Sequence, residues 1–104
     1  MQGLTTGQKS ALVNKMVIEL PVLRAKLGLS QEELGEKIGL SRQMMVAMET
    51  GKRPMTWNTY LSLMLVFLHN PPTAELLRAL GVYTDELQRF LDVNTFERGN
   101  RLTQ

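Results

Sequence analysis

The sequence predicts a single all-α domain, a compact bundle of about five to seven short helices. Apolar residues recur at intervals of three and four, which is the spacing of one helix face, and glycines, prolines and capping residues divide the chain into short helical segments. No segment has the pattern of a β-strand, and no internal repeat is present. A chain of 104 residues can bury one core and is too short for two.

The first helix is expected from about Gln8 to Leu27, because an apolar stripe runs along this segment. Pro21 falls inside it and removes one backbone hydrogen bond, so the helix should kink there or divide in two near Leu20. Gly28, just past the last apolar residue, is typical of a helix end. The stripe consists of Leu12, Met16, Leu20, Leu23 and Leu27.

Two short helices joined by a tight turn are expected next. Ser30 and Glu33 have the spacing of a capping box, which begins a helix over 31–38. Gly35 is small where the two helices would cross closely. Gly39 permits the positive φ that the turn needs.

The second of these helices is expected from Arg42 to about Thr50, with Ser41 as its cap and Gly51 at its end. A basic loop over 52–54 follows. This spacing is that of a helix-turn-helix, whose second helix projects into a DNA major groove. The apolar positions that would lock the pair together are Leu34, Ile38, Leu40, Met45 and Met48.

The rest of the chain predicts three more helices. Thr56 caps a helix over 57–68, in which nine of 12 residues are apolar and face all sides, so neighbours should cover it twice. After the breaker at 69–72, Thr73 caps a helix that Gly81 stops, and Thr84 caps another over 85–92.

The run LRAKLGLSQEELGEKIGLSRQMMVAMETGKRP, residues 23–54, resembles the phage-repressor (Cro-like or Xre) helix-turn-helix family. The shared features are the glycine before the capped SQEEL, the glycine-x-serine turn and the glutamate-x-glycine-lysine end. With the flanking helices, the resemblance covers roughly residues 14–68, about half of the chain. It implies a lambda-repressor-like helix-turn-helix fold and double-stranded DNA as the partner.

The resemblance also implies which residues contact DNA. Gln31 aligns with a glutamine that touches a phosphate at the start of the first short helix. Ser41 and Arg42 open the recognition helix, and Gln43 aligns with a position that reads a base edge. A glutamine amide can pair with adenine, while Arg42 could pair with guanine or hold a phosphate.

The remaining outward positions of the recognition helix carry no polar head group. Met44, Val46 and Ala47 offer only apolar contacts, so part of the specificity would come from DNA shape. In the loop that follows, Lys52 and Arg53 are expected to contact phosphates. Arg24 and Glu49 align with a pair of opposite charges inside the family's domain and are expected to be structural.

The net charge of +2 is small but unevenly distributed. Residues 1–30 carry +3, residues 31–53 carry four positive and four negative groups, residues 73–97 carry −3, and the end from residue 98 carries +2. Phosphates would repel the acidic segment, so it should face away from DNA.

We therefore divide the chain into four parts: an N-terminal helical extension over 1–13, a helix-turn-helix domain over 14–69, C-terminal helices for dimerisation or partner binding over 70–93, and a flexible tail over 94–104. The apolar residues after the helix-turn-helix exceed what short helices need for one face, which favours a homodimer. The expected interface residues are Leu65, Leu76, Leu77, Leu80, Tyr83, Leu87, Phe90 and Leu91.

These patterns favour a DNA-binding transcriptional regulator, a repressor on a palindromic operator. Two alternatives stay open: an antitoxin whose C-terminal segment binds a toxin protein, and a protein-interaction adaptor that does not bind DNA. An enzyme is not expected, because no nucleophile is paired with a base; with no cysteine and the single His69, we expect no metal site and no cofactor. No apolar run is long enough for a membrane span and no signal peptide is evident, so we expect a cytoplasmic protein.

Overall fold

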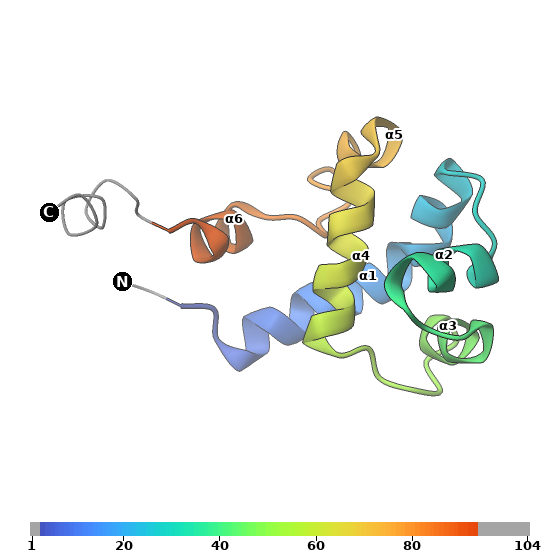
Figure 1. Ribbon diagram of the computed structural model, residues 1–104. Helices are drawn as coiled ribbons and strands as arrows, with labels where there is room; N and C mark the ends of the chain where they lie inside the picture. Colours follow the sequence, from blue (N-terminus) through green and yellow to red (C-terminus); the bar gives the residue numbers. More distant parts are fainter. Residues whose placement is uncertain (1–2, 94–104) are drawn as a thin grey trace, which may run out of the picture.

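The computed structural model describes residues 3–93, and this part of the chain is all-helical (Figure 1). It contains six helices and no strand, which confirms the predicted all-α class. The helices are α1 (Thr6–Lys26), α2 (Gln31–Ile38), α3 (Arg42–Glu49), α4 (Trp57–His69), α5 (Pro71–Ala74) and α6 (Asp85–Leu91). Within residues 3–93, no helix is long and apolar enough to cross a membrane. The predicted flexible tail lies outside the described residues.

Helix α1 runs without interruption through Pro21, so the predicted division in two near Leu20 is wrong, while the alternative of a kink at Pro21 stays a prediction. Pro21 is exposed, and water can bond the carbonyl group that the ring leaves unpaired. On the opposite side, Leu20 and Leu23 are fully buried and hold the helix against the core. The helix also begins earlier than predicted, because Thr5 and Gln8 form a capping box.

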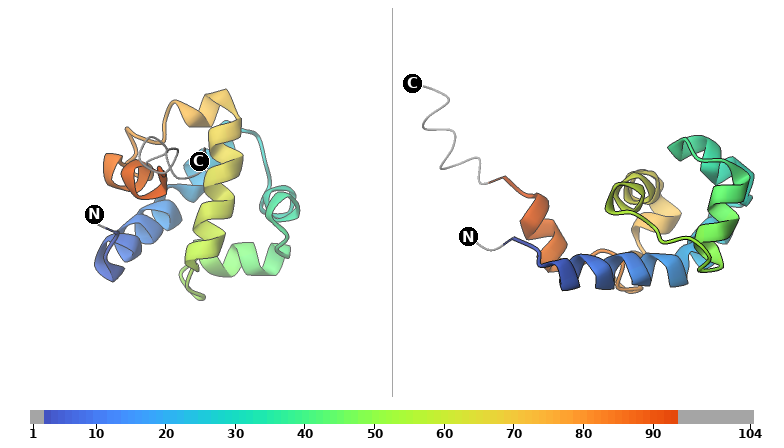
Figure 2. Two further views of the ribbon diagram at one scale, coloured as in Figure 1. Left: turned by 60° about the vertical axis from the view of Figure 1, so that its left-hand side comes forward. Right: turned by 90° about the horizontal axis from the view of Figure 1, so that it is seen from below.

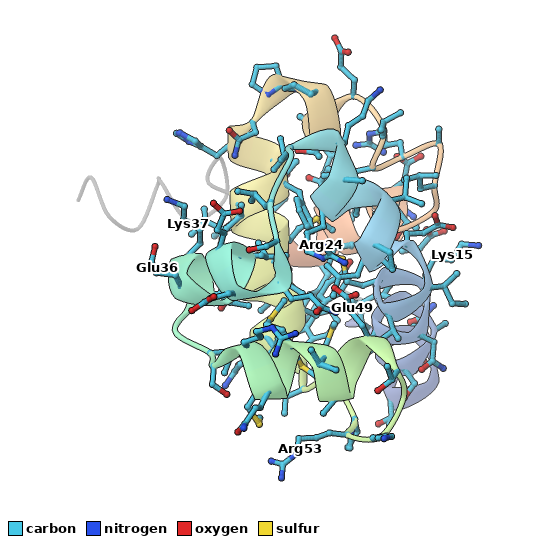
Figure 3. All side chains as sticks on the ribbon, turned by 90° about the vertical axis from the view of Figure 1, so that its right-hand side faces the viewer. Lys15, Arg24, Glu36, Lys37, Glu49 and Arg53 are labelled. Atoms are coloured by element: carbon cyan, nitrogen blue, oxygen red, sulfur yellow. The ribbon has the colours of Figure 1, made fainter. Side chains whose placement is uncertain are left out.

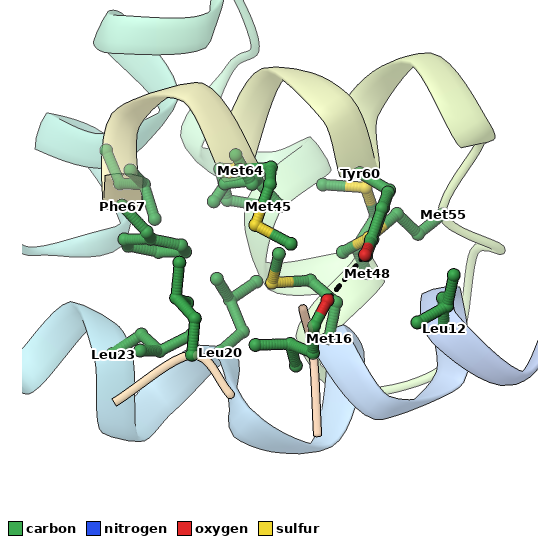
Figure 4. Close-up of a cluster of buried hydrophobic side chains, with 14 of the residues drawn as sticks. Leu12, Met16, Leu20, Leu23, Met45, Met48, Met55, Tyr60, Met64 and Phe67 are labelled. Atoms are coloured by element: carbon green, nitrogen blue, oxygen red, sulfur yellow. Dashed lines mark hydrogen bonds between the residues drawn. The ribbon is translucent and has the colours of Figure 1, made fainter. Parts of the chain in front are cut away.

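The core lies between α1 and α4 and is closed by the helix pair α2–α3 (Figure 4). Methionines fill much of it: Met16, Met45, Met48 and Met64 are all at most 2% exposed. Flexible thioether side chains fit the irregular space between helices that cross at different angles. The Tyr60 hydroxyl donates to the carbonyl of Val82, which ties the first turn of α4 to the segment before α6.

The C-terminal segment departs from the prediction at one element. A helix is expected from Thr73 to Gly81. The structure has instead the short helix α5, which begins at Pro71 and ends at Ala74, and turns over 75–80. Thr73 is not a cap: it is fully buried, and its hydroxyl donates to the carbonyl of Phe67 at 2.7 Å. The cap of α6 at Thr84 is as predicted.

Figure 1 shows how the helices are arranged around α4, which stands at the centre. The pair α2–α3 lies on one side, and the first half of α1 extends with α6 to the other. The loop after α3, α3 itself and the first half of α1 lie along the lower side of this view. Figure 2 shows that side from below, with α1 along one edge and α3 at one end.

Candidate nucleic-acid interface

The turn between α2 and α3 is built on two glycines. Gly39 ends α2 with φ of +79°, a left-handed conformation that glycine adopts without a side-chain clash. A Cβ on Gly35 would lie 2.4 Å from the carbonyl oxygen of Leu40, so the turn packs directly on the bare glycine. The Leu40 amide donates to the Gly35 carbonyl at 2.8 Å. These contacts fix the angle at which α3 leaves the turn.

The first turn of α3 presents two polar side chains to solvent. Ser41 caps the helix by accepting a hydrogen bond from the Met44 amide at 3.1 Å. Arg42 and Gln43 are exposed, and neither side chain forms a hydrogen bond or ion pair within residues 3–93. Both head groups are therefore available to an external partner.

The apolar side chains of α3 that the sequence places on its outer face are less exposed to solvent than expected. Met44, Val46 and Ala47 are half-buried, while Met45 and Met48 belong to the core. The helix is short and lies close to the domain, so only a narrow edge of these three side chains remains accessible. Any apolar contact to a thymine methyl is limited to that edge.

The loop after α3 is fastened to the end of that helix. Both the Lys52 and Arg53 amides donate to the carbonyl of Ala47, at 2.9 and 3.1 Å. Gly51 has φ of +77°, which lets the chain turn back at this point. Both basic side chains are exposed, and Arg53 points away from the domain in Figure 3. A fixed backbone thus carries two cations beside α3.

Arg24 and Glu49 form the expected ion pair, with Arg24 Nε 2.9 Å and Nη2 3.1 Å from the Glu49 carboxylate oxygens (Figure 3). The same carboxylate accepts a third hydrogen bond, which Gln31 Nε2 donates to Glu49 Oε1 at 3.1 Å. Arg24 also donates to the carbonyl of Leu29 at 3.0 Å. The ion pair links α1 to α3, and the hydrogen bond from Gln31 links α2 to the same carboxylate.

Gln31 therefore has a different position from the one expected. Its side chain is half-buried, and Nε2 donates one of its two hydrogens to Glu49, so one amide hydrogen remains for the predicted phosphate contact, which stays a prediction. The neighbouring Glu33 accepts hydrogen bonds from the backbone and side chain of Ser30, which hold its pKa below the usual value for a glutamate. A charged carboxylate in this turn is also unfavourable to phosphate.

The predicted interface residues fall into three groups. Leu65 is 72% exposed and Leu91 is 47% exposed, so both can meet a partner. Leu77 and Leu87 are fully buried, and the prediction is wrong for these two, because both side chains belong to the domain's own hydrophobic core. The half-buried residues are Leu76, Leu80, Tyr83 and Phe90.

One basic side chain on this side of the molecule was not predicted. Lys9 Nζ lies 5.4 Å from the ring centroid of Trp57 and 5.4 Å from that of Phe90. Trp57 itself stacks on Tyr60, with ring centroids 4.8 Å apart. The charge count of residues 1–30 includes Lys9, but no sequence pattern places it beside residues 48 and 81 positions away. Only the fold brings these groups together.

Comparison with known proteins agrees with this geometry. A family described as a helix-turn-helix domain matches residues 16–67, half of the chain. The matched segment runs from the middle of α1 to the last turns of α4 and contains the whole α2–α3 unit. No curated protein and no solved structure matches the chain significantly.

Proposed function

This chain belongs to the helix-turn-helix domain family, and from that membership we propose that it is a sequence-specific DNA-binding regulator with α3 as its recognition helix. The observation that carries the proposal is a set of three cations and one amide side chain beside the turn. Arg42, Gln43, Lys52 and Arg53 are all exposed, and none has an acidic partner within 4 Å in the part of the chain that the structure describes.

The roles follow from chemistry and position. Arg42 and Gln43 lie in the first turn of α3, where a recognition helix reaches base edges, and both side chains can form paired hydrogen bonds with a purine. Lys52 and Arg53 flank the helix and would hold phosphates, which fixes the register of α3 on the duplex. We propose binding and not catalysis, without a cofactor, in the cytoplasm.

The decisive experiment compares two matched pairs of substitutions. An operator is first selected from random duplexes with the wild-type protein. Arg42→Ala with Gln43→Ala should weaken binding to this operator by about 30-fold or more, since each base contact is worth about 1 to 3 kcal/mol. Gln88→Ala with Arg89→Ala removes the same two residue types from α6, where both are exposed, and should change affinity by less than about twofold.

Equal affinity of the two double variants for the operator would refute α3 as the recognition helix. Absence of salt-dependent binding to any duplex would favour the adaptor without DNA binding, because neutralised phosphates make affinity fall steeply with salt.

We also propose that the protein acts as a homodimer through the outer face of α4. Leu65 has the largest exposed fraction of the bulky apolar side chains within residues 3–93, and Leu68 on the next turn is 42% exposed. Leu65 lines a groove of about 570 Å³ together with Leu27, Leu29 and Val66, and Lys37, His69 and Asn70 form its polar part. Covering this surface with a second copy would remove apolar area from water.

Sedimentation tests the dimer. Leu65→Asp should convert the protein to monomer at micromolar concentration, whereas Leu91→Asp on α6 should leave the dimer intact. A monomeric wild-type protein, or a dimer lost only through Leu91, would refute this interface. In a dimer the two α3 helices would enter successive major grooves about 34 Å apart, which requires a palindromic operator.

We further propose the phage-repressor (Cro-like or Xre) branch of the family and a repressor's role. The support is the motif over residues 23–54. A reporter gene behind the selected operator should be less active when the protein is present. An increase would make the protein an activator.

A further inference from the structure

A groove runs between the first half of α1, which precedes the matched helix-turn-helix segment, and the loop after α3, which belongs to it. Its volume is about 450 Å³. Lys9, Ser10 and Asn14 of α1 form one wall, and Arg53 lies on the other. Its apolar lining includes Met48 and Trp57. No acidic side chain lines it within the described residues.

Neither cation of the groove forms an ion pair within residues 3–93. Arg24, Arg78 and Arg89 each have a carboxylate within 4 Å, whereas Lys9 and Arg53 have none among residues 3–93. The Lys9 ammonium group is instead held between the rings of Trp57 and Phe90, 5.4 Å from each centroid. Aromatic faces stabilise a cation without neutralising it, so the groove is left with two positive charges.

The groove is continuous with the surface already proposed to meet DNA. Arg53 belongs to both, and Met48 and Gly51 connect the groove to the end of α3. In Figure 1, the first half of α1 lies along the same side of the molecule as α3 and its loop, and Figure 2 shows both from below. A duplex lying against α3 and the loop would therefore continue toward Lys9.

We propose that this groove holds the sugar-phosphate backbone of the same duplex, with Lys9 and Arg53 as the phosphate-binding cations and Ser10 and Asn14 as neutral hydrogen-bonding groups. The inference rests on the proposed function and extends it, because it assigns a DNA contact to residues that precede the matched helix-turn-helix segment. The contact adds affinity without base specificity, since a phosphate carries no sequence information.

The test removes one charge and preserves packing. Lys9→Met keeps an unbranched side chain between the two rings and deletes the ammonium group. Lys26→Met is the matched control, because it removes the same charge from the exposed far end of α1. Binding to the selected operator is measured by fluorescence anisotropy between about 50 and 300 mM salt. For Lys9→Met, we expect the slope of log affinity against log salt to fall by about 1, with about a fivefold to tenfold loss at 0.1 M salt.

Three further measurements distinguish a phosphate contact from a structural role. The preference for the operator over a mutated operator should be unchanged in Lys9→Met, and Lys9→Arg should restore affinity. The difference between wild type and Lys9→Met should also disappear on a duplex shortened by a few base pairs at the end that reaches the groove. A structural role would instead lower the thermal midpoint and weaken binding to both duplex lengths alike.

The outcomes separate this inference from the proposed function. If Lys9→Met and Lys26→Met have identical salt slopes while Arg42→Ala still weakens operator binding, the groove does not bind phosphate and α3 remains the recognition helix. Loss of affinity that is independent of salt would also overturn it. If the wild-type protein binds no duplex, the proposed function fails and the groove assignment fails with it.

Discussion

Replacing Gly35 by alanine tests whether close packing of the α2–α3 turn stabilises the domain. The new Cβ would lie 2.4 Å from the Leu40 carbonyl oxygen and 3.1 Å from Met45 Cγ. Carbon atoms in good contact are about 3.5 to 4 Å apart, so the backbone at Leu40 has to move by about 1 Å. That movement also strains the hydrogen bond from the Leu40 amide to the Gly35 carbonyl.

The expected net loss is about 2 to 3 kcal/mol in the free energy of unfolding. Overpacking costs about 1 to 3 kcal/mol and a weakened hydrogen bond about 1 kcal/mol, while alanine returns up to about 1 kcal/mol of helix propensity. For a domain of this size, the thermal midpoint should fall by about 10 to 20 °C. Circular dichroism on heating measures it.

Gly7→Ala is the control, because Gly7 lies in α1 and the nearest atom to its added Cβ, Thr5 Oγ1, is 3.9 Å away. This variant should be neutral or more stable by up to about 1 kcal/mol. If Gly35→Ala matches Gly7→Ala in midpoint, the turn adapts freely and the reasoning is wrong. If Gly35→Ala keeps the wild-type thermal midpoint but no longer binds the operator, the turn has accommodated the new Cβ by displacing α3.

Three other substitutions test buried polar contacts. Glu49→Ala should cost about 2 to 4 kcal/mol in urea unfolding, because it leaves the partly buried Arg24 without its partner; exposed Glu36→Ala should stay within about 0.5 kcal/mol. Burial raises the pKa of Tyr60 above its usual value of 10, so the folded state retains the proton while the unfolded state loses it. The contribution of protonated Tyr60 to the free energy of unfolding should therefore be fully present below pH 10 and be lost as the pH rises above it. In Tyr60→Phe, the free energy of unfolding should fall less between pH 9 and 11 than in the wild type. An equal fall in both proteins would contradict this. Thr73→Val should cost about 1 to 3 kcal/mol, because the Phe67 carbonyl loses its donor in the core; an unchanged urea midpoint would show that another donor replaces it.

Local signals predicted the helix-turn-helix well. Ser30 and Ser41 cap α2 and α3 as expected, and Gly39 has the left-handed conformation assigned to it. The reason is that caps and turn glycines act through atoms three or four residues away, so their effect is contained in a short stretch of sequence.

The C-terminal segment was predicted less well, although a signal was present. The sequence pattern predicts a helix breaker at Pro71 and Pro72, whereas these prolines form the first positions of α5, where the missing amide proton costs nothing. Once the helix begins there, Thr73 lies inside it and its hydroxyl turns back to the end of α4. The residues that follow form turns, so helical periodicity does not tell which leucines are buried.

Apart from the Arg24–Glu49 pair, which the family resemblance implies, the sequence pattern does not predict contacts between distant segments. Nothing local distinguishes Leu77, which is fully buried, from Leu65, which is 72% exposed. The partner of Gln31 is a carboxylate 18 residues away, and the aromatic rings around Lys9 belong to α4 and α6. Such contacts depend on how the helices pack, which no single helix determines.

The arrangement separates the residues that stabilise the domain from those proposed to recognise DNA. Arg24, Glu49 and Gly35 act between helices on the inner side of α2–α3, whereas Arg42 and Gln43 face outward without a partner within residues 3–93. Substitution of the outward pair should therefore change the preferred operator with little change in thermal midpoint. With only two base-reading head groups on α3, affinity depends on the phosphate contacts around it. This is why the small net charge of +2 matters less than the position of each cation.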